Sequence, residues 1–491
     1  MTKKDIQTII QVLKKYPEVE IAVLYGSRAL GTYQRGSDID IALKGSHLTS
    51  SICSHIHFEL EEETLLPYFF DITDYQRIKN KKLKEHIDRV GKVIYGIDSG
   101  KLREENSTLP RGWVETTLGE VATFQRGFDL PKKNRIRGKY PLMVSNGQDG
   151  THKEFKVKAP GVVTGRSGTL GQVYYVKDDF WPLNTTLWIK DFHKNDVKFV
   201  YYFLKEIPFE RYNAGSGVPT LNRNHIHPIS ISSPPLPEQK AIAGVLSSLD
   251  AKIDLLQQQN QSLEKIAQTL FKQWFVEFNF PDENGKPYKD NDGEMVGSAL
   301  GEIPKDWGGK TIEDIVLNLD NKRIPLSSRQ RADKEGKYPY YGASGIVDFI
   351  DEYIFEGDHI LFSEDGENLR SRKQPIVFLV DDKFWVNNHA HILRGKKEFY
   401  FYYIYLFLSS IDISHIITGA VQPKINKTNL HSLELVFPDD TVVIKFDRIV
   451  TPLFNKIKNN KKQIETLTEI RDAILPKLMS GKIRVSEEYE L

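Results

Sequence analysis

The sequence predicts an α+β multidomain protein, in which a small α/β domain is followed by two mixed α/β domains that are separated by two long antiparallel helices. Three observations support this prediction. The length of 491 residues suggests roughly three or four domains. A helical pattern of apolar residues fills residues 235–280 and returns near the C-terminus. A series of short motifs precedes the first pattern and returns, in the same order, before the second.

The first long helix is predicted between the proline-rich start at Pro235 and Pro281, which stops it. The same spacing of apolar residues recurs at 441–479, where Leu453 corresponds to Leu249. Because each helix has at least ~36 residues at ~1.5 Å each, the pair would be ~54 Å long and would bury its stripes as an antiparallel coiled coil. The alternative, in which each stripe packs only on its own globular core, is less favoured because the stripes repeat in register. The first stripe consists of Ile242, Val245, Leu249, Ile253, Leu256, Leu263, Ile266, Leu270 and Trp274.

Two further features of the helices carry expectations. Asn260 and Asn460 interrupt the two stripes, and a buried asparagine can fix the register of a coiled coil; two solvent-facing asparagines explain the pattern equally well. The aromatic segment FKQWFVEF at 271–278 holds more apolar residues than a two-helix seam uses, which predicts an exposed docking surface for another protein.

The globular segments in front of the helices also repeat. LPRGWVETTLGEV from Leu109 corresponds to IPKDWGGKTIEDI from Ile303, VKDDFWPLN to VDDKFWVNN, and VPTLNRNHI to QPKINKTNL. Short aromatic and β-branched runs broken by glycine turns predict mixed α and β structure in both copies. The predicted boundaries are 1–98 for the small domain, 99–108 for a linker, 109–234 for the first repeat domain, 235–280 for the first helix, 281–302 for a linker, 303–437 for the second repeat domain, 438–481 for the second helix and 482–491 for a tail.

Composition excludes several classes of protein. No run approaches eighteen apolar residues and the first segment carries charges throughout, so we expect a cytoplasmic protein without a membrane span. The single cysteine, Cys53, excludes an internal disulfide and is expected to be a buried hydrophobic residue. The total of 67 basic and 66 acidic residues is balanced, but residues 109–233 hold 18 basic against 11 acidic residues, whereas 303–437 hold 17 against 19. Only the first repeat domain is therefore basic.

Two similar domains on paired helices would suit a target with two separated halves, such as duplex DNA. In the first repeat domain, KKNRIRGK at 132–139 and LNRN at 221–224 supply cations for phosphates and asparagines for base edges, although a solvated surface explains basic loops as well.

Several motifs resemble the specificity subunit of type I restriction-modification systems: WVETTLGEVATFQRG, GSGVPTLNRNHI followed by SSPPLPEQKAIAGVLSSLDAKID, TLFKQWFVEF and ILPKLMSGKIRV. The resemblance covers residues 109 to about 485. It implies two target recognition domains that each read one half of a bipartite DNA sequence. It also implies helices that dock methyltransferase subunits, with a motor-nuclease restriction subunit joining them, and no cofactor or catalytic centre in this part of the chain. By analogy the DNA-binding candidates are Lys132, Lys133, Arg135, Arg137, Asn146, Arg166, Asn184, Asn222 and Arg223 in the first domain and Arg329, Arg331, Ser344, Arg370, Arg372, Asn388, Asn426 and Lys427 in the second.

The N-terminal segment LYGSRALGTYQRGSDIDIAL, at 24–43, carries a different pattern. Gly26 and Ser27 lie at a predicted strand-to-helix turn, where backbone N–H groups can hold phosphates. Asp38 and Asp40 are two apart on a predicted strand and therefore share a face, and Asp71 comes from the later strand PYFFDIT. Three such carboxylates would bind Mg²⁺ with substrate phosphates completing its shell.

This pattern resembles the minimal nucleotidyltransferases of the polymerase-β superfamily over residues 1 to about 98. The resemblance implies that Asp38, Asp40 and Asp71 are the catalytic, metal-binding residues and that the cofactors are Mg²⁺ and a nucleoside triphosphate, with ATP expected. Many minimal members act as adenylyl-transferring antitoxins, but no helical toxin-like domain follows here. The nucleotide-binding candidates are Gly26, Ser27, Arg28 and Ser37, with Arg35 as a further candidate for the triphosphate.

The leading hypothesis is a DNA sequence-specificity subunit with a fused nucleotidyltransferase domain. The alternative is a Mg²⁺-dependent nucleotidyltransferase that modifies a protein or nucleic acid and uses the repeat to target DNA. The histidine pairs His225 with His227 and His389 with His391, each expected on one strand face, are interpreted as surface or core residues because no third zinc ligand is evident.

Overall fold

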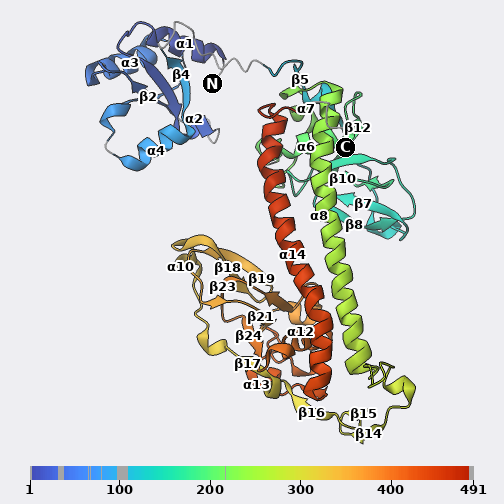
Figure 1. The fold of residues 1–491 in the computed structure, drawn as a ribbon. Coiled ribbons are helices and arrows are strands. Elements are labelled where there is room, and N and C mark those ends of the chain that lie inside the picture. The colour runs from blue at the N-terminus through green and yellow to red at the C-terminus, as the bar shows by residue number, and fades with distance from the viewer. Residues whose placement is uncertain are drawn as a thin grey trace. The chain divides into compact units, whose positions relative to one another are not determined.

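The computed structural model describes residues 3–30, 38–64, 66, 68–78, 80–96, 109–215 and 217–485. The chain divides into two compact units: Met1–Ala243 with Pro476–Leu491, and Gly244–Leu475. Figure 1 shows the order of the elements along the chain. Within the described residues, no helix is both long enough and apolar enough to cross a membrane.

The N-terminal domain is a four-stranded sheet with helices around it. The strand order is β3-β2-β1-β4, with β2 antiparallel to β1 and parallel to β3. The alternation of strands and helices confirms the expected α/β unit, and Cys53 is buried in its core as predicted. After β3 the chain forms one short turn of helix at Tyr75–Arg77, and Asn80 then caps the helix that begins at Lys81. The elements are α1 Lys3–Leu13, β1 Ile21–Tyr25, α2 Gly26–Leu30, β2 Ile39–Lys44, α3 Ser50–Glu62, β3 Phe70–Asp74, η1 Tyr75–Arg77, α4 Lys81–Val90 and β4 Lys92–Gly96.

The first repeat domain (residues 109–234) contains a sheet of order β10-β9-β12-β6, a second sheet β11-β7-β8 and the pair β13-β5. Small clusters of buried residues, such as Met143 with Phe180 and Leu142 with Trp181, lie between these elements. The elements are β5 Val114–Thr117, α5 Leu118–Val121, β6 Thr123–Arg126, η2 Lys132–Asn134, β7 Tyr140–Val144, β8 Gly147–His152, β9 Gly161–Gly165, β10 Val173–Val176, β11 Trp181–Pro182, β12 Thr186–Asp191, α6 Val197–Lys205, η3 Phe209–Tyr212, α7 Arg223–Ile226 and β13 Ser230–Ser233.

The second repeat domain (residues 303–437) repeats this plan with sheets β17-β24-β21-β22 and β19-β18-β23-β20 and the pair β16-β25. A connecting segment before it holds η5 Lys289–Asn291, β14 Met295–Ser298 and β15 Gly301–Pro304. The domain's elements are β16 Gly308–Thr311, α9 Ile312–Ile315, β17 Val316–Asn318, η6 Asp320–Lys322, α10 Ser328–Ala332, β18 Glu335–Gly342, β19 Gly345–Ile350, β20 Phe355–Glu356, β21 His359–Ser363, α11 Asn368–Ser371, β22 Val377–Val380, β23 Lys383–Val386, β24 Ala390–Gly395, η7 Glu398–Tyr400, α12 Phe401–Ser410, η8 Ser414–Ile416, α13 Lys427–His431 and β25 Glu434–Phe437.

Equivalent positions in the two repeat domains follow from matching backbone hydrogen bonds. Thr117 and Thr311 each start a short helix with a capping box, so residues at the same distance after them correspond, as Arg126 and Asp320 do. Three pairs of backbone bonds coincide: Leu118 N to Ile229 O with Ile312 N to Leu433 O, Arg166 N to Thr185 O with Glu364 N to His389 O, and Leu221 N to Arg166 O with Ile425 N to Glu364 O.

The two long helices are α8 Leu236–Phe271, continued by a π-helical turn Lys272–Val276, and α14 Asp440–Met479. They pack as an antiparallel pair within the second unit, because Arg471 Nη1 lies 2.8 Å from Asp250 Oδ1 and Asn460 Nδ2 lies 2.8 Å from Asn260 Oδ1. The predicted helix pair is therefore present (Figure 1). Asn460 is fully buried and bonded across the seam, so the alternative of two solvent-facing asparagines is wrong.

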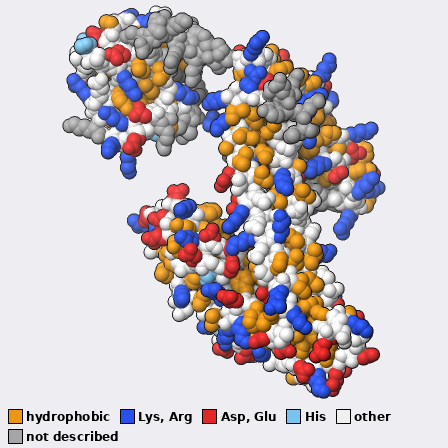
Figure 2. Space-filling model, in the orientation of Figure 1, with side chains coloured by type: hydrophobic (Ala, Val, Ile, Leu, Met, Phe, Trp, Pro, Cys, Tyr) orange, Lys and Arg blue, Asp and Glu red, His pale blue; other side chains and the backbone are white. Residues whose placement is uncertain are grey.

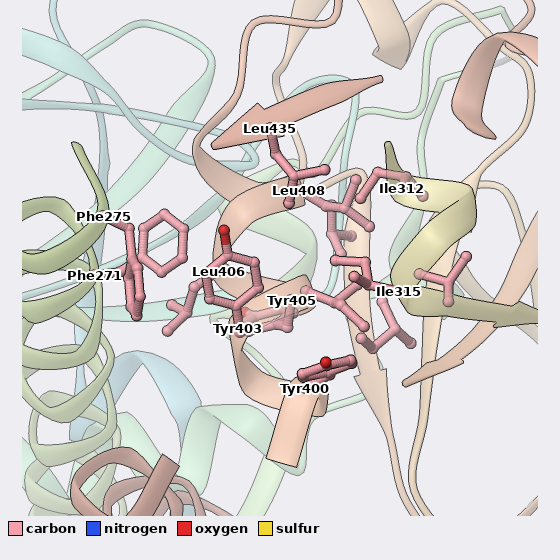
Figure 3. Packing of buried hydrophobic residues seen from close by; sticks show 14 of the residues in the cluster. Phe271, Phe275, Ile312, Ile315, Tyr400, Tyr403, Tyr405, Leu406, Leu408 and Leu435 are labelled. Atoms are coloured by element: carbon pink, nitrogen blue, oxygen red, sulfur yellow. The ribbon is translucent and has the colours of Figure 1, made fainter. Parts of the chain in front are cut away.

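The predicted aromatic docking surface at 271–278 is wrong. Phe271, Trp274 and Phe275 are buried, and they pack against the second repeat domain (Figure 3). The ring centroid of Phe275 lies 4.8 Å from that of Tyr403 and 4.9 Å from that of Phe446. This cluster accounts for the apolar residues at 271–278 that a two-helix seam does not use. The periodicity of the helix alone does not show that the second repeat domain covers them.

The predicted helix stripe is also partly wrong. Val245 and Ile266 are 37% and 48% exposed, whereas Leu246 and Ala267, one residue later, are fully buried. Each long helix must cover both its partner helix and a globular domain, so its buried face is wider than one seam and shifts along its length.

Candidate functional site

The three predicted carboxylates of the N-terminal domain come together at one edge of its sheet. Asp40 on β2 stands opposite Asp71 on the parallel strand β3, and Asp38 precedes β2. Asp40 is half-buried, whereas Asp38 and Asp71 are exposed. Asp38 lies just before β2 and not on it as expected, so the strand pairing places only Asp40 and Asp71 opposite each other.

Gly26 lies against this group at the turn from β1 into α2. Its φ of +68° is in the left-handed region, and a Cβ atom there would lie 2.2 Å from Oδ2 of Asp40. A larger residue would therefore displace the carboxylate, which explains the glycine in this motif.

The charges around Asp40 suit a cation. Burial raises the pKa of the Asp40 carboxyl, and the neighbouring charges of Asp71 and Asp38 raise it further, while Arg28 acts in the opposite sense. A bound divalent cation would relieve this repulsion, so the residues fit a metal ion as hard oxygen ligands. The ligand atoms of these three aspartates are not all within 4.8 Å of one another, unlike those of one other cluster in the described chain.

The predicted nucleotide-binding residues are only partly visible. Arg28 Nε donates to the backbone oxygen of Asp38 at 3.1 Å, and its guanidinium lies 4.7 Å from the centre of the Tyr68 ring. Ser27 follows Gly26 in α2. Ser37 and Arg35 lie outside the described residues.

A pocket of about 580 Å³ lies in the first repeat domain, between β6, the segment after β9 and residues 220–223. Its lining includes the predicted Arg166, Asn222 and Arg223 and also Arg126, which sequence reasoning missed. Arg126 stands in the motif VATFQRG, next to a glycine, and that motif was the only available signal.

The other candidates of the first repeat domain lie around it without a common centre. Arg135 pairs with Asp149 at 2.8 Å, and Asn184 donates to Asp129. Asn222 caps α7 through Asn224 N at 3.0 Å. The remaining candidates are exposed: Lys132, Lys133, Arg137 and Asn146.

In the second repeat domain, two predicted arginines are held within the protein. Arg331 Nε donates to Asp348 Oδ2 at 2.9 Å. Arg370 donates to the backbone oxygen of Gly419 at 2.7 Å. Asn426 caps α13 through Asn429 N at 2.8 Å. The other candidates are exposed: Arg329, Ser344, Arg372, Asn388 and Lys427.

A buried ionic cluster in the second repeat domain was not predicted. Asp320, Glu364 and His391 have ligand atoms within 4.8 Å of one another, as a metal site would require. Both ring nitrogens of His391 are engaged, however, Nδ1 with Asp320 Oδ2 at 2.6 Å and Nε2 with the oxygen of Ile425 at 2.8 Å. Arg323 and Lys424 lie 2.7 and 3.1 Å from the Glu364 carboxylate. The cluster therefore already has its own cations, and we interpret it as a structural ion network.

This network sets the acidity of its members. Burial alone would raise the pKa of Asp320, but the hydrogen bond and charge of His391 lower it overall. Burial likewise opposes ionisation of Glu364, and the bond from Arg323 reverses that effect and lowers the Glu364 pKa.

The expected strand position of His225 and His227 is wrong. The segment forms the short helix α7, and Nε2 of His227 accepts a hydrogen bond from Phe124 N at 3.0 Å. His389 pairs with Asp365 at 2.7 Å. His391 is buried, His227 is half-buried, and His225 and His389 are exposed.

Comparisons with known proteins cover most of the chain. Residues 110–265 and 304–469 match the family model of the type I restriction modification DNA specificity domain. Residues 7–100 match the model of the polymerase beta nucleotidyltransferase family.

Individual relatives agree with these matches. The type I restriction enzyme MjaIX specificity subunit of Methanocaldococcus jannaschii is 31% identical over 313 residues, which cover 59% of this chain and 70% of the relative. A putative type I specificity subunit of Mycoplasma genitalium is 27% identical over 77% of this chain and 97% of its own. The crystal structure of a type I restriction-modification S subunit from M. genitalium is 21% identical, with a TM-score of 0.50, over 77% of this chain and 97% of the other.

Proposed function

The chain belongs to the family of type I restriction-modification DNA specificity proteins, and from this premise we propose that it recognises a bipartite DNA sequence for a complex of methyltransferase and restriction subunits. The observation that carries the proposal is the repeated domain plan, in which each copy is followed by a long helix and the two helices pack antiparallel within the second unit. Each repeat domain would read one half of the target, and the helices would keep the two halves in fixed order.

The test of this function is methylation in a cell. We expect co-expression with the methyltransferase subunit of the same restriction-modification system to produce methylated adenines or cytosines within one two-part motif in the host DNA. Deleting the second repeat domain, residues 303–437, together with the helix α14 that follows it would remove the second half of that motif. A methylome without any two-part motif, from a complex that purifies intact, would contradict the proposal.

The helices also offer a surface for the methyltransferase. Val245, Leu255, Ile266, Ile449 and Ile470 are apolar residues of the helix pair that are 37–48% exposed. Figure 2 shows hydrophobic side chains along both helices. Exposed apolar side chains in series mark protein interaction sites.

Changing one of these residues to glutamate would test the docking surface. We expect Ile266→Glu to prevent co-purification of the methyltransferase, because it places a charge in an apolar interface. Gln261→Glu is the matched control, since Gln261 is an exposed polar residue of the same helix. Normal co-purification with Ile266→Glu would exclude this face.

For the N-terminal domain we propose a nucleotidyltransferase that uses Asp38, Asp40 and Asp71 to hold Mg²⁺ and Gly26, Ser27, Arg28 and Ser37 to hold the phosphates of ATP. The metal would supply charge neutralisation at the phosphates. The protein's own contribution is the fixed carboxylate edge beside Gly26, whose missing side chain leaves room for Asp40.

Labelled ATP tests this second activity. We expect the full chain with Mg²⁺ to transfer label to a protein or nucleic acid partner, and Asp38→Ala with Asp40→Ala to abolish transfer. Glu85→Gln is the control, because Glu85 is an exposed carboxylate of the same domain. Transfer that persists in the double variant would refute the carboxylate assignment, and an inactive domain would leave specificity as the only function.

A further inference from the structure

The pocket of the first repeat domain brings three arginines together. Arg126 ends β6, Arg166 follows β9, and Arg223 begins α7. Asp129 is the acidic residue of the lining, and its nearest carboxylate oxygen is 3.8 Å from Arg126. Three guanidinium groups and one carboxylate give the pocket a positive charge.

Arg166 is the arginine of the pocket whose orientation the protein itself fixes. Arg166 is half-buried, and its Nη1 donates to the backbone oxygen of Asn184 at 3.2 Å, which fixes the direction of the guanidinium. Burial lowers the pKa of Arg166, and the neighbouring charge of Arg126 lowers it further. Arg223 is exposed, and its guanidinium has no hydrogen-bond partner within the part of the chain that the structure describes. The site therefore holds cations that the protein itself does not neutralise.

The equivalent positions of the second repeat domain carry residues of different charge. Glu364 stands where Arg166 stands, Asp320 where Arg126 stands, and Arg323 where Asp129 stands. Those residues satisfy one another in the buried network with His391 and Lys424. The charge pattern at these three positions is thus inverted and internally paired. Lys427, which begins α13 as Arg223 begins α7, is the one exposed cation that remains among these four equivalent positions, so the arginine cluster of the first domain has no counterpart here.

We propose that the arginine pocket of the first repeat domain holds a backbone phosphate of the DNA, and that the second repeat domain has no equivalent phosphate site. This inference rests on the proposed DNA-recognition function and names which part of the DNA the pocket takes. A phosphate projects from the duplex and fits a concave site, whereas base edges lie on the groove floor and are reached by projecting side chains. Arginine is also the residue that binds phosphate oxygens in a paired, directional way.

The test measures how binding of the intact methyltransferase complex to its target duplex depends on salt. The slope of log K against log salt concentration becomes shallower by about 0.9 for each phosphate that the protein no longer neutralises. We expect Arg166→Gln to reduce the slope by about one and to weaken binding about tenfold at low salt, with the methylated motif unchanged in sequence. Arg223→Gln should also reduce the slope and weaken binding. This variant is expected to fold normally, because Arg223 lies on the surface.

Controls separate the possible outcomes. Arg211→Gln removes an exposed arginine of the same domain outside the pocket and should leave the slope unchanged. A degenerate base in the first half of the motif with Arg166→Gln would mean that the arginine reads a base, which overturns the phosphate assignment. An unchanged slope with both pocket variants would mean that the pocket does not touch DNA. If the wild-type complex methylates no two-part motif, the proposed function fails as well, and that result is visible before any variant is made.

Discussion

The two repeat domains share one backbone plan but hold the long helix α8 in different ways. The first uses a polar clamp: buried Glu238 accepts hydrogen bonds from Trp113 Nε1 at 3.0 Å and from Arg484 Nε at 2.6 Å. The second uses an aromatic cluster in which Phe271, Trp274 and Phe275 are buried. The two ends of α8 are therefore held by different interactions, with hydrogen bonds and an ion pair at Glu238 and aromatic packing at residues 271–275.

The contrast extends to the equivalent pocket. Arg166 is half-buried and lines the pocket in the first domain, whereas Glu364 at the same place pairs with Arg323 and Lys424. The same position of one fold thus lines an arginine pocket in one copy and belongs to a paired ion network in the other.

The largest effect is expected from the aromatic cluster. Phe275→Ala would remove a ring packed within 4.8–5.9 Å of Tyr403, Phe446 and Trp307, measured between ring centroids. We expect the free energy of unfolding to fall by about 3–5 kcal/mol, measured by chemical denaturation. Val276→Ala, at a neighbouring side chain that is 56% exposed, should change it by less than about 0.5 kcal/mol. Equal effects of the two variants would show that the cluster does not hold the helix.

The buried ion network comes next. His391→Leu copies Leu187, the residue at the same place in the first domain, and removes the hydrogen-bond partner of the Asp320 carboxylate. We expect destabilisation of about 3 kcal/mol, seen as a lower Tm. His389→Gln breaks a pair whose histidine is 46% exposed and should cost less than about 1 kcal/mol. A neutral His391→Leu would mean that the network contributes nothing to stability.

Whether a feature of this structure could be predicted from the sequence depends on how far apart in the chain its contacting residues lie. The repeat, the two helices and the carboxylate edge were predicted, because each depends on local spacing or on motif order, as with Asp38 and Asp40. The ion network was not predicted, because Asp320, Glu364 and His391 lie far apart in the chain and no periodicity connects them. For the aromatic segment at 271–278 the sequence favours a partner protein, because it shows that this apolar face is buried by something and does not show which element buries it.

The same network predicts an acid-sensitive second domain. The pKa values of Asp320 and Glu364 are lowered below the ordinary values of 3.8 and 4.5, so both groups release protons more readily in the folded state than in the unfolded one. Their contribution is complete above the unfolded pKa values and disappears as pH falls through the lower, folded values. We therefore expect the Tm to fall as the pH drops below about 4.5, by a few degrees. Glu364→Gln should lower the Tm at pH 7 and flatten this dependence; a Tm that rises with acid would contradict the sign.

The smallest net effect is expected at the helix seam. Asn460 is fully buried, and its Nδ2 donates to Asn260 Oδ1 at 2.8 Å, while its own Oδ1 has no partner in the described protein. Replacing both residues with leucine exchanges a partly satisfied polar pair for apolar contact, so we expect stability to change by less than about 1 kcal/mol or to rise.

The leucine pair should nevertheless loosen the register of the helices, because a buried asparagine penalises the alternatives in which it has no partner. Spin labels at Gln257→Cys and Lys461→Cys, in a Cys53→Ser background, would measure this as a distance distribution. We expect one narrow distance with both asparagines present and a broad or double distribution with both replaced. An equally narrow distribution in the leucine variant would show that the domains at the helix ends set the register, and that the polar pair does not.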